Sequence, residues 1–596
     1  MFQKFTTSLL LVLAVLSFNS SYSQDRREYR QTAVDGSEVG IPKTNTQKSA
    51  PVIQDNNIQP MTVNAYTVNY TSFNLASYYD LQSNGTTNEV WQDPLNPLYV
   101  HAAVMVMPVF GSTRFCIYLL STDRGLTWDS FGNIAESQSG FPSIDGLSDG
   151  SAIVTMHTTA GGVPAARSQV FIDLGPGFGT FNRFDPGLVN GNAQIWGRVL
   201  ATSNISNPIK WVLANSFNTS DIASTTTGSS LTPPGTFSPW IDYPSETAEQ
   251  YSLALAANGK IGNAFISQGD VNQGDVEFRE SSDNGLTWST PIKIYDANVA
   301  VDSLGAFRGI SMIYLGNTPC VTFEVDYLTV TGLFPTLPSY IYFWSPTING
   351  GTPKKIAGDN NVPFYPNIGP SGSYGVYTPL CRPAIGKTNS SASNLLFVAM
   401  NAATSQIAAD SNVFYATYFT VSYDGGNSWV APEKITPAAP LKDWRYVSMS
   451  HTNSLNAAGD KWTVQMVIQN HDYAGAFAPA EPPGTANFTS VRVDVPLTGI
   501  REINSSVPGS FSLHQNYPNP FNPTTSIRFD IQKATKVTLE VYNTNGQKVE
   551  TLIKNEFVTA GTKEISFSGS NLSSGIYFYT LSAGEIKETK KMMLIK

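Results

Sequence analysis

The segment Ser281–Trp288, with the sequence SSDNGLTW, has the composition of a tight turn between two strands. An Asp side chain can accept backbone N–H groups across such a loop, and Gly can adopt the positive φ angles that the turn requires. The Trp that follows can pack its ring on the sheet. The same pattern, S-x-D-x-G-x-[TS]-W, recurs at Ser121–Trp128 and Ser422–Trp429. Three copies of one turn predict a repeated all-β unit.

Apolar runs of β type surround these turns, and their midpoints are roughly 50 to 75 residues apart, the size of a propeller blade. Seven runs look equivalent: Leu98–Val106, Ala152–His157, Lys210–Asn215, Ile261–Ser267, Thr318–Val325, Leu395–Met400 and Lys461–Ile468. One blade cannot bury both faces of its sheet alone, whereas a closed ring buries them all. We predict an all-β chain in which residues 65–497 form a β-propeller. Seven blades are favoured and six are possible, because the long step at the sixth unit can contain an insertion.

The fourth unit shows the expected blade most clearly. Its inner strand is predicted at Gln250–Ala257, its third at Asp275–Ser282 and its fourth at Thr287–Ile294. The turn motif then lies between the third and fourth strands. Tyr66–Tyr70 alternates like a strand, and we expect it to add the outer strand that closes the ring against the last blade.

The three turns resemble the Asp-box, or bacterial neuraminidase repeat, of sialidase-like propellers. The resemblance implies that the motif residues build turns at the outer part of the blades: Asp123, Gly125, Trp128, Asp283, Gly285, Trp288, Asp424, Gly426 and Trp429. The sialidase enzymes also carry an Arg-Ile-Pro motif, which this sequence lacks. The inner segment of the first unit, Asn88–Asp93, contains no arginine at all, so the resemblance does not extend to sialic-acid cleavage.

Four units place an arginine near the start of the expected inner strand: Arg198, Arg308, Arg382 and Arg445. Inner strands face the central channel, so these guanidinium groups can converge there and bind carboxylate, sulfate or phosphate. Alternatively, each pairs with a carboxylate or carbonyl of the neighbouring blade. Three tryptophans beside this layer either stack on sugar rings or fill the space between blades: Trp91, Trp196 and Trp444.

Carboxyl groups near the same rim are candidates for acid–base chemistry: Glu89, Asp93, Asp145, Asp302 and Asp443. Two carboxylates about 5–10 Å apart would suit glycoside hydrolysis. The sequence has no phosphate-binding loop, dinucleotide fingerprint or cluster of metal ligands, so we expect neither cofactor nor metal.

Composition excludes several further classes. With 36 Lys+Arg against 45 Asp+Glu the net charge is −9, which argues against nucleic acid as a partner. Cys116, Cys320 and Cys381 are far apart and form no CxxC pair. We expect buried free thiols rather than a zinc site or a disulfide scaffold.

The first residues have the pattern of a secretory signal peptide, residues 1–23. Lys4 precedes the apolar run Leu9–Leu16, and Ser21 and Ser23 supply small residues before the expected cleavage point. The run is too short to span a bilayer, and no later segment is long enough, so the mature chain is expected to have no transmembrane segment. Residues 24–64 are polar and are expected to be a flexible leader.

A linker at residues 498–510 precedes a second β domain, residues 511–596, with the size and short strands of an Ig-like sandwich. Tyr517–Pro523 has the sequence YPNPFNP, Leu572–Tyr577 the sequence LSSGIY, and Lys590–Met592 is basic. In this order they resemble the type A C-terminal sorting domain of the type IX secretion system. The residues that support the resemblance are Tyr517, Pro518, Pro520, Phe521, Gly575, Tyr577, Lys590 and Lys591.

This resemblance implies a Gram-negative bacterium of the Bacteroidetes–Chlorobi kind, passage through the periplasm and recognition by the outer-membrane export machinery. The protein would then be released or attached to the cell surface. An Ig-like adhesive module is the alternative for this domain. For the propeller we expect the binding of an extracellular, anionic glycan or protein ligand at the central channel. The alternatives are a glycosidase-like hydrolase or lyase acting on an anionic polysaccharide, and a structural component of a surface assembly.

Overall fold

The computed structural model describes residues 61–596 except 64–65, 76, 78–84, 87, 108–112, 189–190, 202–209, 217–221, 227–236, 244–249, 268–273, 284, 299–302, 330–331, 334–337, 364–377, 392, 409–412, 475–485, 498–499, 505 and 570–571. The expected signal peptide, most of the expected leader and Asp302 therefore lie outside the described residues. Apart from a 3₁₀ turn, η1 (Asn349–Gly351), the described elements are all strands. The all-β prediction is confirmed.

The strand pairing forms seven antiparallel blades in chain order. Blade 1 contains β3 (Val90–Gln92), β4 (Val100–Val106), β5 (Phe115–Ser121) and β6 (Asp129–Asn133). Blade 2 contains β7 (Ser139–Gly146), β8 (Ala152–Thr158), β9 (Arg167–Asp173) and β10 (Phe181–Phe184). Blade 3 contains β11 (Gln194–Ala201), β12 (Lys210–Ser216), β13 (Ile222–Thr226) and β14 (Ile241–Tyr243). Blade 4 contains β15 (Tyr251–Leu255), β16 (Ile261–Ser267), β17 (Asp275–Ser281) and β18 (Ile292–Tyr295). Blade 5 contains β19 (Leu304–Leu315), β20 (Thr318–Thr329), β21 (Gly332–Leu333), β22 (Tyr340–Trp344) and β23 (Lys354–Ala357).

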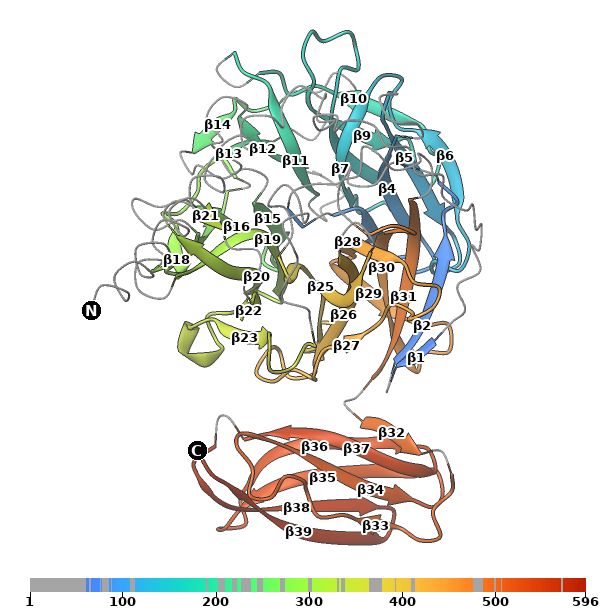
Figure 1. Cartoon of the computed structure of the whole chain (residues 1–596), viewed down its shortest axis with the longest axis vertical. Coiled ribbons are helices and arrows are strands. Elements are labelled where there is room, and N and C mark those ends of the chain that lie inside the picture. Colours follow the sequence, from blue (N-terminus) through green and yellow to red (C-terminus); the bar gives the residue numbers. More distant parts are fainter. Residues whose placement is uncertain are drawn as a thin grey trace, which may run out of the picture.

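The last two blades share one sheet. Blade 6 contains β24 (Leu380–Thr388), β25 (Leu396–Ile407), β26 (Val413–Ser422) and β27 (Glu433–Lys434), and blade 7 contains β28 (Asp443–Met449), β30 (Lys461–His471) and β31 (Asn487–Pro496). The short β29 (Thr452–Leu455) joins them, because it pairs in parallel with β24 and antiparallel with β30. All seven runs that the sequence singles out overlap the second strand of a blade. Figure 1 shows the blades following one another around the ring from β4 (blue) to β30 (orange).

The N-terminal strand closes the ring. β2 (Tyr66–Ser72) pairs antiparallel with β31 from Thr67 opposite Asp494 to Ser72 opposite Thr489, and becomes the outer strand of blade 7. Tyr66 and Val68 point into the core that blades 6 and 7 share. The predicted closing strand is therefore confirmed. The end of the expected leader adds β1 (Met61–Val63), which pairs with β2.

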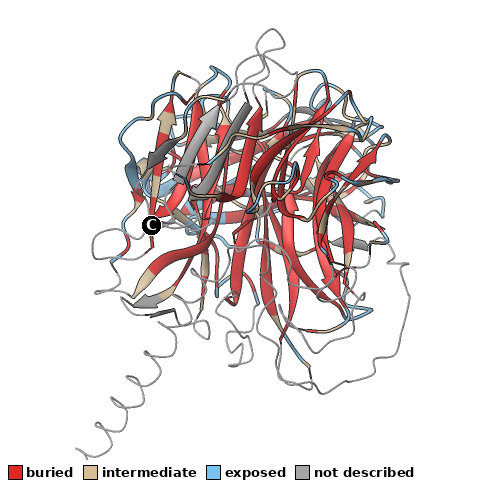
Figure 2. Ribbon diagram, turned by 90° about the horizontal axis from the view of Figure 1, so that it is seen from above, coloured by how far each residue is buried: buried red, intermediate tan, exposed pale blue. Residues whose placement is uncertain are grey.

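Burial follows the blade architecture. Among the residues whose burial is described, those in the middle of the second strands are almost entirely buried, and exposed residues concentrate in loops and outer strands (Figure 2). Apolar side chains from facing blades form separate cores, as the ring prediction requires. Cys116, Cys320 and Cys381 are buried free thiols, as expected. Burial raises the pKa of Cys116 and Cys320 to about 12, so these thiols stay protonated.

The C-terminal unit is a two-sheet β-sandwich. One sheet contains β32 (Ile500–Asn504), β37 (Gly561–Ser568), β34 (Thr524–Ile531) and β33 (Ser512–Leu513), and the other β36 (Lys548–Val558), β35 (Thr535–Asn543), β38 (Gly575–Ala583) and β39 (Ile586–Leu594). Their inner faces share one apolar core. The expected sandwich is confirmed, although part of the expected linker forms its strand β32. No helix in the described part of the chain is long and apolar enough to cross a membrane.

Candidate functional site

Five inner strands contain a β-bulge close to their first residues. The pairing with the second strand shifts in β7, β11, β19, β24 and β28. In four of these bulges a bulky residue has a left-handed backbone: Phe141 (φ 55), Trp196 (φ 55), Arg382 (φ 51) and Tyr446 (φ 57). Such conformations are costly for bulky side chains and occur mainly where function or packing maintains them. The end of the ring where inner strands begin is therefore the candidate site.

The bulges place the four predicted arginines at non-equivalent positions. Arg445 is the last paired residue before its bulge, Arg382 is the left-handed residue itself, and Arg198 is the first paired residue after its bulge. Arg308 lies inside the bulge of β19. All four residues are buried, with exposed fractions of 1% to 5%. The sequence predicts that the four arginines occupy the same position in each inner strand. In the structure they occupy different positions relative to the bulges.

Two of these arginines, Arg308 and Arg382, meet at one carboxyl group, that of Glu324 in β20. The backbone N–H groups of Arg308 and Arg382 donate to its two carboxyl oxygens at 3.2 and 2.6 Å. Glu324 thus joins the inner strands of blades 5 and 6 through the backbone of both bulges. Burial raises the pKa of Glu324, and the charges of Arg382 and Arg308 oppose that rise.

Arg445, on the inner strand of blade 7, is bound from several sides. Its Nε lies 2.8 Å from Oδ2 of Asp443, and one Nη donates to the carbonyl of Val413 at 3.1 Å. The guanidinium carbon lies 4.1 Å from the ring centroid of Tyr415 in blade 6. In the same way Arg382 lies over the ring of Tyr446 at 4.8 Å. These contacts correspond to the expected alternative in which the arginines connect neighbouring blades.

Arg198 lies apart from this group, beside a segment that crosses the centre of the ring. Its Nη2 donates to the carbonyl of Thr86 at 3.2 Å, and the Thr86 hydroxyl donates to the carbonyl of Pro383 at 3.0 Å. Because Arg198 belongs to blade 3 and Pro383 to blade 6, Thr86 connects opposite sides of the ring. Thr86 is buried, and together with Arg198 it lines a narrow cavity on the ring axis.

Glu89 follows this crossing segment, and of the described candidate acids it has the fewest polar partners for its carboxyl group. It is 1% exposed, and neither carboxyl oxygen has a hydrogen-bond partner in the described part of the chain. Burial raises its pKa well above the ordinary value, against the opposing charge of Arg198. The neutral acid is therefore favoured at Glu89.

The other candidate acids are buried or engaged in local structure. Asp93 is buried and accepts the N–H of Leu95 at 2.8 Å. Asp145 is partly exposed, and its Oδ2 accepts the N–H of Ala201 at 2.8 Å. Asp443 accepts the N–H of Tyr415 in addition to its contact with Arg445. Within the described ranges, no group of three or more His, Cys, Asp or Glu residues could hold a metal ion.

The three tryptophans lie in the cores between blades. Trp91 is 8% exposed, and its ring fills the space beside Gly146, where an added Cβ would lie 2.0 Å from the indole. Trp196 and Trp444 are 3% and 1% exposed. With no open ring face, these side chains fill the space between blades, which was one of the two expectations for them.

The three turn motifs have the same hydrogen bonds. Asp424 Oδ1 accepts the Ser428 N–H at 2.9 Å, and Oδ2 accepts the Ser428 hydroxyl at 2.6 Å. Asp123 and Asp283 hold Thr127 and Thr287 at the same distances. Each motif lies between the third and fourth strands of its blade, away from the inner strands. The carboxylates therefore build turns, as the resemblance implies.

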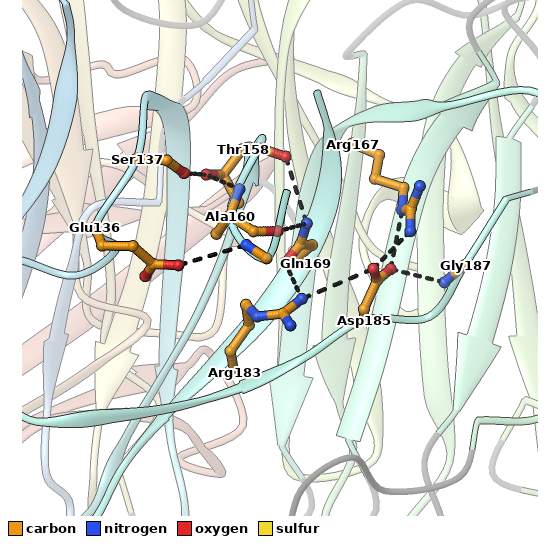
Figure 3. A network of polar contacts seen from close by, with 10 residues as sticks. Glu136, Ser137, Thr158, Ala160, Arg167, Gln169, Arg183, Asp185 and Gly187 are labelled. Carbon is orange, nitrogen blue, oxygen red and sulfur yellow. Dashed lines mark hydrogen bonds and ion pairs between the residues drawn. The ribbon is translucent and has the colours of Figure 1, made fainter. Parts of the chain in front are cut away.

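Polar contacts of a different kind lie at the outer side of blade 2 (Figure 3). Asp185 accepts hydrogen bonds from Arg167 at 2.9 and 2.6 Å, and Arg183 donates to Gln169 at 3.0 Å. Arg183 is the more exposed arginine, with 36% of its side chain accessible. Both arginines donate to side chains within blade 2, away from the candidate site. They can therefore serve as controls for the arginines of that site.

Sequence reasoning missed Thr86, Glu324, Tyr415 and Tyr446. Glu324 had a visible signal, because it is an acid inside the otherwise mostly apolar run Thr318–Val325. The other three are ordinary residues for a strand or a loop, and only the ring brings them to the arginines.

In the sandwich, the structure joins two predicted motif segments that are far apart in sequence. The Met593 N–H donates to Asn519 Oδ1 at 2.9 Å, and Gln515 Nε2 donates to the Lys591 carbonyl at 2.7 Å. Phe521 pairs in parallel with Leu594 and is buried, whereas Tyr517 is 82% exposed. The YPNPFNP segment thus lies along the edge of β39, next to the basic end.

No curated protein matches the chain in sequence. Among solved structures, the exo-β-1,3-galactanase of Phanerochaete chrysosporium with galactose is 9% identical and has a TM-score of 0.30, covering 88% of this chain and 100% of that chain. The exo-β-1,3-galactanase of Clostridium thermocellum is 9% identical with a TM-score of 0.29, covering 83% and 98%. A mannose phosphorylase from Leishmania mexicana in complex with phosphate is 8% identical with a TM-score of 0.24, covering 50% and 84%. These likenesses are too distant to bear on the fold, which follows from the strand pairing.

The family model of the secretion system C-terminal sorting domain matches residues 515–596. The match covers the sandwich from β34 to β39, with both joined motif segments, and begins after β32 and β33. The chain therefore contains a sorting domain that directs it to secretion or to attachment at the cell surface.

Proposed function

We propose that the protein is exported by the type IX secretion system and that its propeller binds an anionic extracellular glycan or protein ligand. The ligand would bind at the end of the ring where the inner strands begin. The supporting observation is the local charge: Arg198, Arg308, Arg382 and Arg445 lie at this end, while burial raises the pKa of Glu89 and Glu324. A positive end on a chain of net charge −9 attracts anions selectively.

Stacking on aromatic rings fixes the guanidinium groups. The guanidinium carbon of Arg198 lies 5.9 Å from the ring centroid of Tyr251, and that of Arg308 4.7 Å from the ring of Phe307. Because the guanidinium groups are already ordered, an anion attracted by their positive electrostatic potential does not have to immobilise them on binding.

Binding is favoured over hydrolysis by the state of the candidate acids. A glycosidase needs two carboxyl groups at its substrate. Glu89, Asp93 and Asp443 are buried, and Asp443 is bound to Arg445. Asp145 is the only described candidate acid that is partly exposed, and it accepts the N–H of Ala201. We therefore assign the arginines a binding role and assign no catalytic residue.

The test uses the purified mature protein on an array of sulfated, uronic-acid and neutral glycans, followed by calorimetry with each ligand found. Arg308→Gln should weaken binding of the anionic ligand roughly tenfold, the effect of losing about 1.4 kcal/mol. Arg183→Gln, at the outer network of Figure 3, is the matched control and should leave binding unchanged. Binding should also weaken as salt is raised.

Two outcomes would overturn the proposal. One is equal binding of neutral glycans, and the other is an affinity that Arg308→Gln leaves unchanged. Release of reducing sugar from an array ligand would favour the hydrolase alternative instead.

A further inference from the structure

The narrow cavity on the ring axis differs from the mouth of the ring, where we place the extracellular ligand. The space open to the centre of a water molecule is about 20 Å³. That space holds one or two waters or one monatomic ion of similar size, and it excludes a sugar. The blades that line it include 2, 3, 4 and 5, and Thr86 crosses beside it.

Three serine hydroxyls in the wall have protons to donate. Ser143, Ser252 and Ser311 each accept a backbone N–H of the next blade, from Val199 at 3.5 Å, Met312 at 3.1 Å and Ile385 at 3.3 Å. Their oxygens are thereby fixed, and none of the three O–H groups has an acceptor in the part of the chain that the structure describes. Buried hydroxyls normally donate as well as accept. Three such donors in one wall therefore indicate an occupant that accepts hydrogen bonds.

The charge of the wall favours an anion over a cation or water. Arg198 lines the cavity, and no Asp or Glu is among its described lining residues. A cation would need carboxylate or carbonyl oxygens. His451 also lines the cavity, and burial lowers its pKa to about 4, so at neutral pH it adds a neutral ring rather than a second charge. A water would need acceptors for its own two protons, whereas an anion uses donors alone.

We propose that the axial cavity binds one small monovalent anion of the size of chloride. The anion accepts hydrogen bonds from Ser143, Ser252 and Ser311 and lies in the field of Arg198. It stabilises the ring by connecting blades that share no strand pairing. Arg198 contributes charge to both sites, but this cavity has room for a monatomic ion only, and Arg308, whose substitution tests the ligand site, does not line it.

The test measures thermal unfolding of the purified mature protein in sodium chloride against sodium gluconate at equal ionic strength. Gluconate is too large for the cavity. The melting temperature should rise with chloride and saturate. The double variant Ser252→Ala, Ser311→Ala should require a roughly tenfold higher chloride concentration for half of the rise, as expected for the loss of hydrogen bonds to a charged group.

Ser448→Ala is the matched control. Ser448 accepts an N–H of the next blade in the same manner, at 2.7 Å, but does not line the cavity. It should lower the melting temperature and leave the chloride dependence unchanged. Crystals grown in bromide should show an anomalous peak in the cavity. The proposal fails if chloride and gluconate give equal melting curves, if the double variant keeps the wild-type chloride dependence, or if the bromide peak is absent; none of these outcomes affects ligand binding at the mouth.

Discussion

The hydroxyl oxygen of Ser448 in blade 7 accepts the backbone N–H of Glu89 in blade 1 at 2.7 Å, across 359 positions of sequence. This bond joins the last and first blades at their inner strands, whereas the pairing of β2 with β31 closes the ring at the outer edge of blade 7. The same kind of bond joins blades 2 and 3, 4 and 5, and 5 and 6. Serines of the inner strands thus connect neighbouring blades near the axis.

We predict that Ser448→Ala lowers the free energy of unfolding by about 1–3 kcal/mol, because the buried Glu89 N–H loses its acceptor. Urea unfolding followed by circular dichroism measures the change. Ser130→Ala, at an exposed position of β6, should be neutral. A variant as stable as the wild type would show that the bond does not stabilise the closed ring.

The closing strand should be equally sensitive. Val68 of β2 is fully buried in the core of blades 6 and 7. Val68→Ala should cost roughly 2 kcal/mol, the transfer free energy of the two lost carbon atoms plus a small cavity. Asn69→Ala, at the adjacent and less buried position, is the control and should cost less. Equal losses in both variants would contradict the role of β2 in the core.

The sequence was most informative where a pattern repeats. Runs such as Ile261–Ser267 have a fixed place in every blade, and the Asp-turns contain their own hydrogen-bond partners, as Asp283 and Thr287 show. The bulges and the serine bonds were not predictable. A bulge changes pairing between strands, and one serine such as Ser252 has no periodic signal. Thr86 reaches Arg198 only after seven blades have closed, so no local pattern can indicate it.

The buried ion pair of blade 7 gives a third prediction. Arg445 and Asp443 are 3% and 0% exposed, and their side chains are 2.8 Å apart. Arg445→Gln should destabilise the protein by about 3–5 kcal/mol, because it leaves Asp443 charged and buried without its partner. The double variant Arg445→Gln, Asp443→Asn should recover part of the loss. Additive losses in a double-mutant cycle would contradict the coupling.

A fourth prediction concerns pH. Burial raises the pKa of Asp145 from 3.8 to about 7, although N–H groups of Ala201 and Gly146 oppose the rise. Between pH 4 and 7 the folded protein therefore holds this proton more tightly than the unfolded chain, so the contribution of Asp145 to stability falls as pH rises and is lost above pH 7. Asp145→Asn should lose less stability than the wild type over this range in urea titrations. Asp149→Asn, in the adjacent exposed turn, should follow the wild type. A wild-type slope in Asp145→Asn would contradict the raised pKa.

The last prediction separates folding of the sorting domain from its recognition. Tyr517 is 82% exposed and Phe521 is 1% exposed, yet both belong to the segment that lies along β39. Phe521→Ala removes a core side chain and should destabilise the sandwich by about 3–5 kcal/mol. Tyr517→Ala removes an exposed ring and should leave thermal unfolding unchanged. If the export machinery recognises this surface, Tyr517→Ala should still retain the protein in the periplasm.

Cell fractionation with surface proteolysis measures delivery, and deletion of residues 511–596 defines the fully retained state. Tyr542→Ala is the matched control, because Tyr542 lies on β35 and its hydroxyl contacts Glu540 within the same strand. Its export should match the wild type. Normal delivery of Tyr517→Ala would assign recognition to another surface of the domain, and normal delivery after the deletion would refute the sorting role. Retention of Tyr517→Ala with unchanged unfolding would identify an exposed side chain, rather than loss of the fold, as the cause.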